Sequence, residues 1–148
     1  MKPTEVLTTE QRDAVLQRSD LKAWTAVMGA WMLTLTTLLL VGHFPGIATL
    51  ALAWIVLPGR QLSLAVLMHE AGHGSLFKTR ALNRWVGQWL CALPVLSDFD
   101  AYARGHRAHH RLAGTAEDPD LPNYHAYPIS KASLKRKWFR ALTGQTGD

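Results

Sequence analysis

Cysteine is almost missing from this chain of 148 residues, because Cys91 is the only one. A disulfide within the chain is therefore excluded, and so is a cysteine-rich metal knuckle. Cys91 stands in an apolar stretch, which predicts a buried thiol without a chemical role. The chain also lacks an internal repeat, and its first 20 positions mix acidic and basic residues in a way that does not resemble a cleaved signal sequence.

Charge is missing from much of the first half of the chain. The 18 residues from Trp24 to Val41 carry no charge and would measure about 27 Å as a helix, close to the roughly 30 Å of bilayer hydrocarbon. A second apolar run covers Ile47 to Met68, and the turn at 42–46 lacks lysine and arginine. The two runs predict a transmembrane helical hairpin. The second run is interrupted at Pro58 to Arg60, which predicts a kink there.

Basic residues outnumber acidic residues by 16 to 11 and give a formal net charge of +5. They lie in the N-terminal tail and beyond the hairpin, so we expect the N-terminus and everything after His73 to face the cytoplasm. The expected partner of this basic surface is a membrane rather than nucleic acid. We expect a multi-pass protein of a bacterial inner membrane, with a tail over residues 1–20 and one domain over residues 21–148.

Three further segments are expected to be helical. Thr8 to Gln17 predicts a short surface helix. Trp85 to Leu96 is apolar but too short to cross a bilayer, which predicts a helix lying in the membrane interface. Ser130 to Arg140 predicts a basic amphipathic helix against lipid. The expected fold is an all-α integral membrane protein, in which a transmembrane helical hairpin is followed by cytoplasmic interfacial helices that carry histidine clusters.

Two histidine clusters stand out, one at the end of the hairpin and one further along the chain. His69 and His73 are four residues apart, and such positions differ by only about 40° around a helix axis. His106, His109 and His110 bring three imidazoles together on one helix face in the same way. The five histidines predict one metal site, open among iron, zinc, copper and nickel. Because they exceed the needs of one tetrahedral zinc, we expect two metals or one of high coordination number.

Carboxylates beside a metal site commonly orient its histidine ligands. Six acidic residues near the clusters are candidates for this role: Glu70, Asp98, Asp100, Glu117, Asp118 and Asp120. His43, in the turn of the hairpin, and His125, in a loop, are expected to have no metal role.

Three stretches match a known pattern: HEAGHGSLF at His69 to Phe77, WVGQWLCALPVL at Trp85 to Leu96, and DAYARGHRAHHRLAGTAEDPDL at Asp100 to Leu121. Through them the chain resembles the membrane fatty acid desaturase family. The resemblance implies a non-haem centre of two iron ions, held by histidines from three boxes. It also implies dioxygen as co-substrate, a ferredoxin, a rubredoxin or a small cytochrome with its reductase as electron donor, and a membrane-associated acyl chain that gains a double bond.

By the same resemblance, all five clustered histidines are implied as iron ligands, the first two from the first box and the last three from the second. A third box is missing, because the only histidine after His110 is His125. The chain is therefore expected to be the N-terminal portion of a desaturase, and we do not expect it to be active alone.

Three other interpretations stay open. HEAGH also fits the HExxH signature of zinc proteases, with Glu70 as general base. The extended signature, however, places glycine and histidine where this chain has Leu76 and Thr79, and it leaves the second cluster unexplained. Hydroxylases and ketolases of lipids or carotenoids share histidine boxes with desaturases, and they differ in inserting oxygen. The third interpretation is a non-catalytic membrane protein that binds a metal or a partner through its cytoplasmic face.

Overall fold

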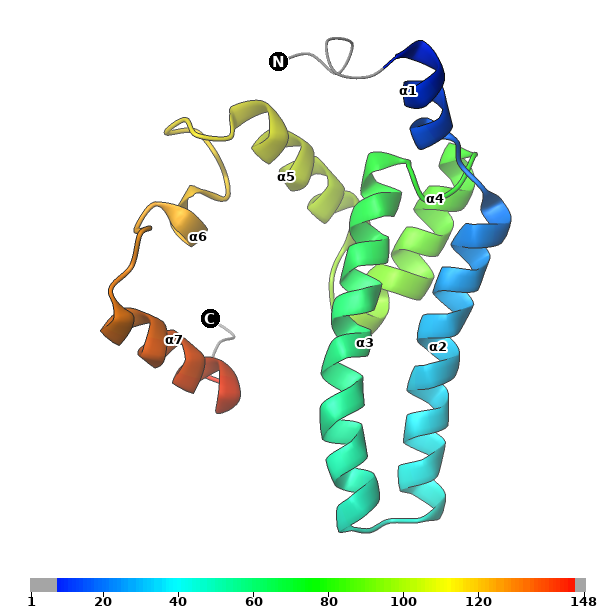
Figure 1. Cartoon of the computed structure of the whole chain (residues 1–148), viewed down its shortest axis with the longest axis vertical. Coiled ribbons are helices and arrows are strands. Elements are labelled where there is room, and N and C mark those ends of the chain that lie inside the picture. The colour runs from blue at the N-terminus through cyan, green and yellow to red at the C-terminus, as the bar shows by residue number, and fades with distance from the viewer. Residues whose placement is uncertain (1–7, 146–148) are drawn as a thin grey trace. The chain divides into compact units, whose positions relative to one another are not determined.

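The structure is a computed structural model that describes residues 8–145, and every regular element in this range is a helix (Figure 1). The predicted all-α class is thus confirmed for the described residues. The chain divides into two compact units, Met1–Arg107 and Ala108–Asp148. The boundary falls inside α5 (Phe99–Leu112), so this helix begins in the first unit and ends in the second. The predicted separation of a tail at residue 20 stays a prediction.

Two long apolar helices form an antiparallel hairpin in the first unit (Figure 1). The short helix α1 (Thr9–Leu16) precedes α2 (Asp20–His43), and α3 (Ile47–His73) follows after a three-residue turn. With 24 and 27 residues, α2 and α3 measure about 36 and about 40 Å, and both are long and apolar enough to cross a membrane. The hairpin is confirmed as a pair of such helices. Its crossing of a bilayer and its cytoplasmic orientation stay predictions.

Helix α3 continues through Pro58, Gly59 and Arg60, the site of the predicted kink. A proline removes one main-chain N–H from the helix, but the helices beside it can hold the chain in register. The Nε atom of Arg60 is buried and has no hydrogen-bond partner among residues 8–145. The prediction that Arg60 is energetically unfavourable in this apolar run therefore agrees with its Nε atom, which is unpaired within the described residues. Pro58 does not end the helix. The predicted kink stays a prediction.

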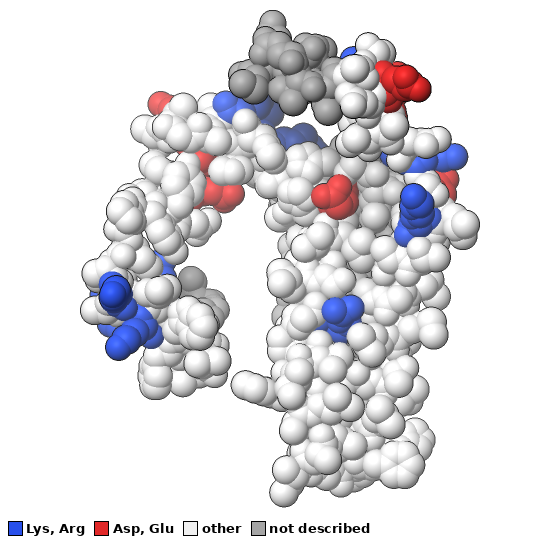
Figure 2. Space-filling view, in the orientation of Figure 1, with Lys and Arg blue, Asp and Glu red and all other residues white. Residues whose placement is uncertain are grey.

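The hairpin is well packed at the end where α3 finishes. Ala23, Val27 and Ala30 of α2 belong to one buried cluster with Leu64 and Leu67 of α3. Small side chains let two apolar helices approach closely. Toward the turn the large apolar side chains are exposed instead, and Figure 2 shows no charged residue at that end on the face drawn. Such a surface suits contact with lipid rather than with water.

A third helical segment packs beside the two long helices. It begins as α4 (Arg80–Val86), continues as a π-helix, η2 (Gly87–Ala92), and ends as a 3₁₀ turn, η3 (Leu93–Val95). The indole Nε1 of Trp31 in α2 donates a hydrogen bond to the carbonyl of Leu90 at 2.9 Å. Cys91 is buried, as predicted. The predicted helix at 85–96 is therefore confirmed as helical but belongs to the packed end of the hairpin, and its place in the membrane interface stays a prediction.

The second unit contains the last turn of α5, the single-turn helix α6 (Leu121–Tyr124) and α7 (Lys131–Leu142). The Ser130 hydroxyl accepts the N–H of Ser133 at 3.2 Å and caps α7. This cap explains why the helix begins where it does. The helix predicted from Ser130 to Arg140 is confirmed.

Candidate metal centre

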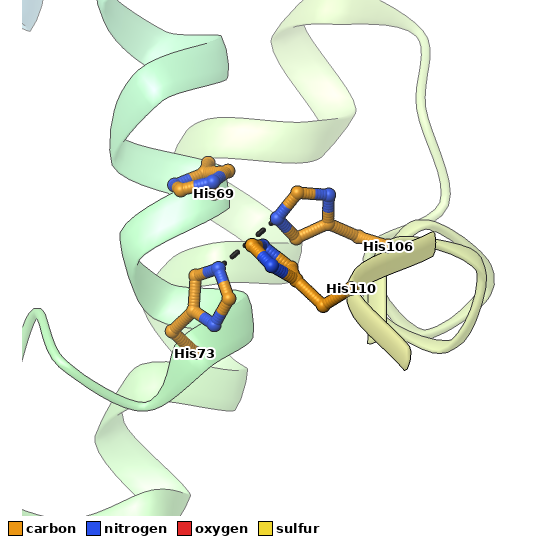
Figure 3. A group of neighbouring side chains, drawn as sticks. All are labelled: His69, His73, His106 and His110. Atoms are coloured by element: carbon orange, nitrogen blue, oxygen red, sulfur yellow. Dashed lines mark hydrogen bonds between the residues drawn. The ribbon is translucent and has the colours of Figure 1, made fainter. Parts of the chain in front are cut away.

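Three histidines from two helices meet in the first unit. The ring centroids of His69 and His73, on the last turns of α3, are 4.6 Å apart. The ring of His106, on α5, lies 4.5 Å from His69 and 4.9 Å from His73. The Nε2 atoms of His73 and His106 are 3.0 Å apart (Figure 3). Two ring nitrogens this close either share a proton or direct their lone pairs at one acceptor, such as a metal ion.

The end of α3 is shaped so that α5 can come close. Gly74 has a left-handed φ of 70° and ends α3 directly after His73. A Cβ at Gly72 would lie only 3.5 Å from the Cβ of Ala103 on α5, so the helices touch there. Arg107 of α5 donates a hydrogen bond from Nη1 to the carbonyl of Gly72 at 3.2 Å. This contact and the Arg107 hydrogen bond hold the two helices together where their histidines meet.

Helix α5 orients its own histidines. Tyr102, one turn before His106, stacks on the His106 ring with centroids 5.5 Å apart and planes inclined by 7°. His110 follows His106 by one further turn, so the continuous helix carries it on the same face (Figure 3). His109 points about 100° away from His110 around the same helix axis. The rings of His109 and His110 are still neighbours, with centroids 5.7 Å apart, and His109 also faces Asp118. That the three imidazoles of the second cluster share one site stays a prediction.

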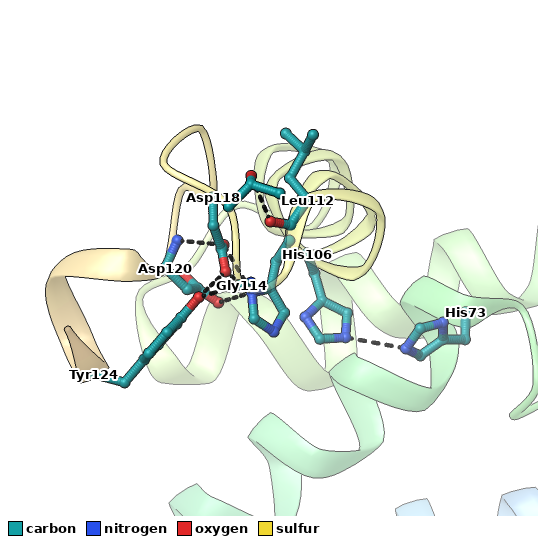
Figure 4. A network of polar contacts seen from close by, with 9 residues as sticks. His73, His106, Leu112, Gly114, Asp118, Asp120 and Tyr124 are labelled. Carbon is teal, nitrogen blue, oxygen red and sulfur yellow. Dashed lines mark hydrogen bonds and ion pairs between the residues drawn. The ribbon is translucent and has the colours of Figure 1, made fainter. Parts of the chain in front are cut away.

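His109 faces the buried carboxylate of Asp118 in the second unit, and Figure 4 shows Asp118 beside Asp120 and Tyr124. Its Nδ1 donates to Asp118, with Oδ1 at 2.8 Å and Oδ2 at 3.1 Å, and Oδ2 of Asp120 lies 3.6 Å away. Asp118 also accepts hydrogen bonds from the hydroxyl of Tyr124 and, at 2.9 Å, from the main-chain N–H of Asp120. The Asp118 carboxylate thus accepts hydrogen bonds from a histidine, a tyrosine and the main chain.

The pKa values show which way the protons lie in this group. Burial alone would raise the pKa of Asp118, but the hydrogen bonds from Tyr124, His109 and the Asp120 N–H outweigh it and lower the pKa to about 2. The hydrogen bond to Asp118 raises the pKa of His109. Because an ionised carboxylate only accepts hydrogen bonds, Nδ1 of His109 must carry a proton. In the neutral ring the lone pair is then on Nε2, as a histidine ligand of a metal requires.

Glu70 holds His69 in the same manner. Its Oε1 lies 3.2 Å from Nδ1 of His69, and its Oε2 accepts the hydroxyl of Ser75 at 2.7 Å. Both carboxylate oxygens are therefore engaged, whereas the general base of a zinc protease needs an oxygen directed at water. The geometry favours an orienting role for Glu70 over a catalytic one.

The other three acidic candidates differ from Glu70, Asp118 and Asp120 in their contacts. Asp98 accepts the N–H of Ala101 at 2.6 Å and caps α5. Asp100 forms an ion pair with Arg84 at 2.6 Å, which raises the pKa of Arg84. Glu117 is exposed and has no hydrogen bond or ion pair within residues 8–145. Sequence proximity alone therefore does not distinguish the carboxylates that reach a histidine.

The sequence did not predict three contacts of the site. Tyr102 stacks on His106, the Ser75 hydroxyl donates to Glu70, and the Tyr124 hydroxyl donates to Asp118. Tyr124 is 15 residues beyond His109 and reaches it only through a folded turn. His43 and His125 place Nδ1 near main-chain carbonyls, at 3.0 Å from Leu39 and 3.2 Å from Leu121. The absence of a metal role for either ring stays a prediction.

A polar cavity of about 470 Å³ opens beside His73 in the first unit. Its polar walls include three arginines, one aspartate and one asparagine: Arg80, Arg84, Arg107, Asp100 and Asn83. The excess of positive charge suits water or an anion and would be a poor environment for an acyl chain.

An apolar cavity of about 410 Å³ lies along the histidine-bearing face of α3. Helix α3 contributes Pro58, Leu62 and Ala65 together with the neutral amide of Gln61, and the apolar segment 94–96 completes the lining. Pro58, Leu62, Ala65 and His69 are spaced by four, three and four residues, so they share one helix face. The cavity therefore begins about 6 Å below His69 along the helix, toward the turn of the hairpin.

The donor set fits a metal ion bound by nitrogen. One ring nitrogen from each of His69, His73 and His106 lies within 4.8 Å of the others. Imidazole suits iron, and it suits zinc, copper and nickel equally. The carboxylates of Glu70 and Asp118, which contact His69 and His109, fix which ring nitrogen carries the lone pair. The assignment of the five histidines as ligands remains a proposal.

Comparison with known proteins identifies a related family. The family model described as fatty acid desaturase matches residues 45–147, a range that includes both histidine clusters. The sn-1 acyl-lipid omega-3 desaturase (ferredoxin) of Synechocystis sp. is 30% identical over 90 residues, which are 60% of this chain and 24% of that protein. The sn-1 oleoyl-lipid 12-desaturase of Arthrospira platensis is 30% identical over 94 residues, 60% of this chain and 26% of that protein. The chain thus spans about a quarter of the length of these relatives. No solved structure matches.

Proposed function

Because the chain belongs to the fatty acid desaturase family, we propose that it is part of a membrane-bound enzyme that introduces a double bond into an acyl chain. The enzyme would be an oxidoreductase with a non-haem centre of two iron ions and O₂ as co-substrate. The observation that carries the proposal is the 3.0 Å approach of Nε2 of His73 to Nε2 of His106, which joins the two histidine boxes. Because the chain spans about a quarter of the length of these relatives, the activity of the whole enzyme is part of the proposal.

The proposed iron ligands are the five clustered histidines: His69, His73, His106, His109 and His110. Bound iron would supply the oxidising power to break an unactivated C–H bond, which no amino-acid side chain possesses. The protein's own contribution is to hold the ligands in place. Glu70 and Asp118 keep a proton on Nδ1 of their histidines, and Tyr102 fixes the plane of His106 by stacking.

The proposed substrate is an acyl chain of a membrane lipid. The relatives' names specify acyl-lipid and oleoyl-lipid substrates. The apolar cavity below His69 supports this choice, because it would place a chain within the depth of the hairpin and on the face that carries the histidines. The polar cavity beside His73 has the wrong character for this role.

The proposed electron donor is a ferredoxin, as the name of the Synechocystis relative states for that protein. A rubredoxin or a small cytochrome with its reductase is the alternative. We propose that the hairpin crosses a bacterial inner membrane with the N-terminus and both histidine boxes in the cytoplasm. The apolar, exposed turn end of the hairpin and the basic residues at its other end support this orientation.

The test is a fatty acid analysis of a host that lacks desaturases and expresses the whole protein with a ferredoxin and its reductase. We expect new double bonds in lipid acyl chains, only in the presence of O₂, and none with His106→Ala. His43→Ala is the matched control and should act like the unaltered protein. Hydroxy or keto products would identify a lipid hydroxylase or ketolase. Bound iron without oxygen consumption or product would identify a non-catalytic metal-binding protein and overturn the proposal.

A further inference from the structure

Helix α7 has a face of exposed apolar side chains. Leu134, Trp138, Phe139 and Leu142 are 48%, 67%, 62% and 66% exposed. Together with Lys135 they line a shallow groove of about 340 Å³. Their spacing of four, one and three residues places them on one side of the helix. Four large apolar side chains in one exposed patch indicate a surface that another phase or molecule covers.

The charge of α7 is of one sign. Its 12 residues include five basic residues and no acidic one: Lys131, Lys135, Arg136, Lys137 and Arg140. Figure 2 shows the positive charge along this helix. Arg136 and Arg140 lie on the side opposite the apolar face, whereas Lys131 and Lys135 lie within its arc, where long side chains can extend past apolar neighbours to reach a charged layer. Lys137 is held in place by Tyr127, with Nζ 3.3 Å from the hydroxyl and 4.8 Å from the ring centre.

The path of the chain brings α7 to a membrane surface. Among the described residues only α2 and α3 are long and apolar enough to cross a bilayer. With a hairpin that crosses the bilayer, the described chain between His73 and Lys131 contains no further helix that could cross, so α7 would emerge on the side where α3 ends. The basic residues of the chain are concentrated on that side, which in membrane proteins is the side with anionic lipid at its surface.

We propose that α7 lies on the surface of this same leaflet, with its apolar face among the outer acyl carbons and with Lys131 and Lys135 on anionic phospholipid headgroups. An apolar face with positive charge at its edges and on its outer side matches such a surface in both respects. A second copy of α7 would bring like charges together and is disfavoured. The helix would thereby anchor the second unit, which carries His109 and Asp118, to the membrane. The inference requires only that the hairpin spans the bilayer and does not depend on the proposed reaction.

The test uses the whole chain in lipid nanodiscs and an environment-sensitive dye on a single introduced cysteine. Leu142→Cys places the dye on the apolar face of α7, and Arg136→Cys, on the other side of the same helix, is the matched control. Cys91 is buried, with its pKa raised to about 12 by burial, so the native thiol does not compete for the dye. Each variant is measured in nanodiscs of phosphatidylglycerol and of phosphatidylcholine, with spin-labelled lipids as quenchers in the membrane and iodide as the quencher in water.

The expected result is lipid quenching and iodide protection at position 142 in phosphatidylglycerol, with the opposite pattern at position 136. Replacing Lys131 and Lys135 by glutamine should weaken the membrane-bound state roughly fivefold for each charge removed, and high salt should do likewise. Three results would overturn the proposal. The first is equal quenching by iodide at both positions. The second is protection from iodide at position 142 without quenching by lipid, which would mean that protein covers the apolar face. The third is equal membrane binding of α7 in phosphatidylglycerol and in phosphatidylcholine. None of these readouts depends on iron or on activity, so failure of the proposed reaction would leave them unchanged.

Discussion

Nε2 of His73 lies 3.0 Å from Nε2 of His106, although 33 positions separate the two residues in the sequence. The contact joins the last residue of α3 to the middle of α5, and it places ring nitrogens of the two histidine clusters face to face. A metal centre at this contact has consequences that can be measured.

His73→Ala or His106→Ala should remove bound iron from the whole protein. Each change deletes one of two converging nitrogens, so the loss of affinity should exceed the roughly 10–100-fold that is typical of residues that only orient a ligand. Iron per protein is measured by elemental analysis after purification. His43→Ala, in the turn of the hairpin, should keep the full iron content. Full iron in His106→Ala would contradict the site.

Asp118→Asn should lower metal affinity by about 10–100-fold, because a neutral amide can also donate to Nδ1 of His109 and holds a proton there less firmly than a carboxylate does. Tyr124→Phe should have a smaller effect, since Asp118 keeps its bonds to His109 and to the main chain. Affinity is measured by titrating the apoprotein with Fe²⁺ against a chelator. Glu117→Gln, at an exposed neighbouring position, is the control. Equal affinities for Asp118→Asn and the control would mean that His109 is not held by this carboxylate.

Ala65→Trp should fill the apolar cavity below His69 without removing iron. The large side chain would occupy the space proposed for the acyl chain, so activity should fall or shift toward shorter chains. Products are measured by mass spectrometry of lipid acyl chains, with iron content in parallel. Leu52→Trp changes an exposed position of α3 outside the cavity and should leave the product profile unaltered. The same product profile in both variants would rule out the cavity as the substrate site.

The Cys91 thiol should resist alkylation in the folded protein. Burial raises its pKa to about 12, so at pH 8 only about one thiol in ten thousand is ionised, and the side chain is inaccessible as well. Because the thiolate is the reactive form, the rate should rise only as the pH approaches that pKa or as the protein unfolds. Iodoacetamide labelling followed by mass spectrometry, with and without dodecyl sulfate, measures this. Fast labelling of the folded protein at pH 8 would contradict the packing around η2.

Gly87→Ala should destabilise the packed end of the hairpin by about 1–3 kcal/mol. A Cβ at this position would overlap the ring of Phe99, which is itself buried and has no room to move away. The melting temperature in detergent measures the effect. Gly29→Ala is the matched control, because its Cβ would meet no atom within 4 Å, and the added helix propensity should stabilise by up to about 1 kcal/mol. Equal melting temperatures for the two variants would show that α5 does not pack closely on Gly87.

Some expectations failed or fell short for physical reasons that the sequence does not reveal. The stretch from Trp85 to Leu96 is helical, but it changes from α to π to 3₁₀ geometry where it packs on α2 and α3. Proximity in sequence suggested six carboxylates for the histidines, whereas Asp98 caps a helix and Asp100 pairs with Arg84.

The sequence by itself determined the features that depend on neighbouring residues. Charge-free runs of sufficient length predict the two long helices, and spacings of three and four residues place His69 with His73 and His106 with His110. The tertiary structure alone decided which side chains from distant segments meet. His73 faces His106 because α5 packs on the end of α3, where Arg107 bonds to the Gly72 carbonyl, and Tyr124 reaches Asp118 because the chain turns back after α5. These contacts depend on how whole helices and turns pack, and no local pattern of residues specifies that packing.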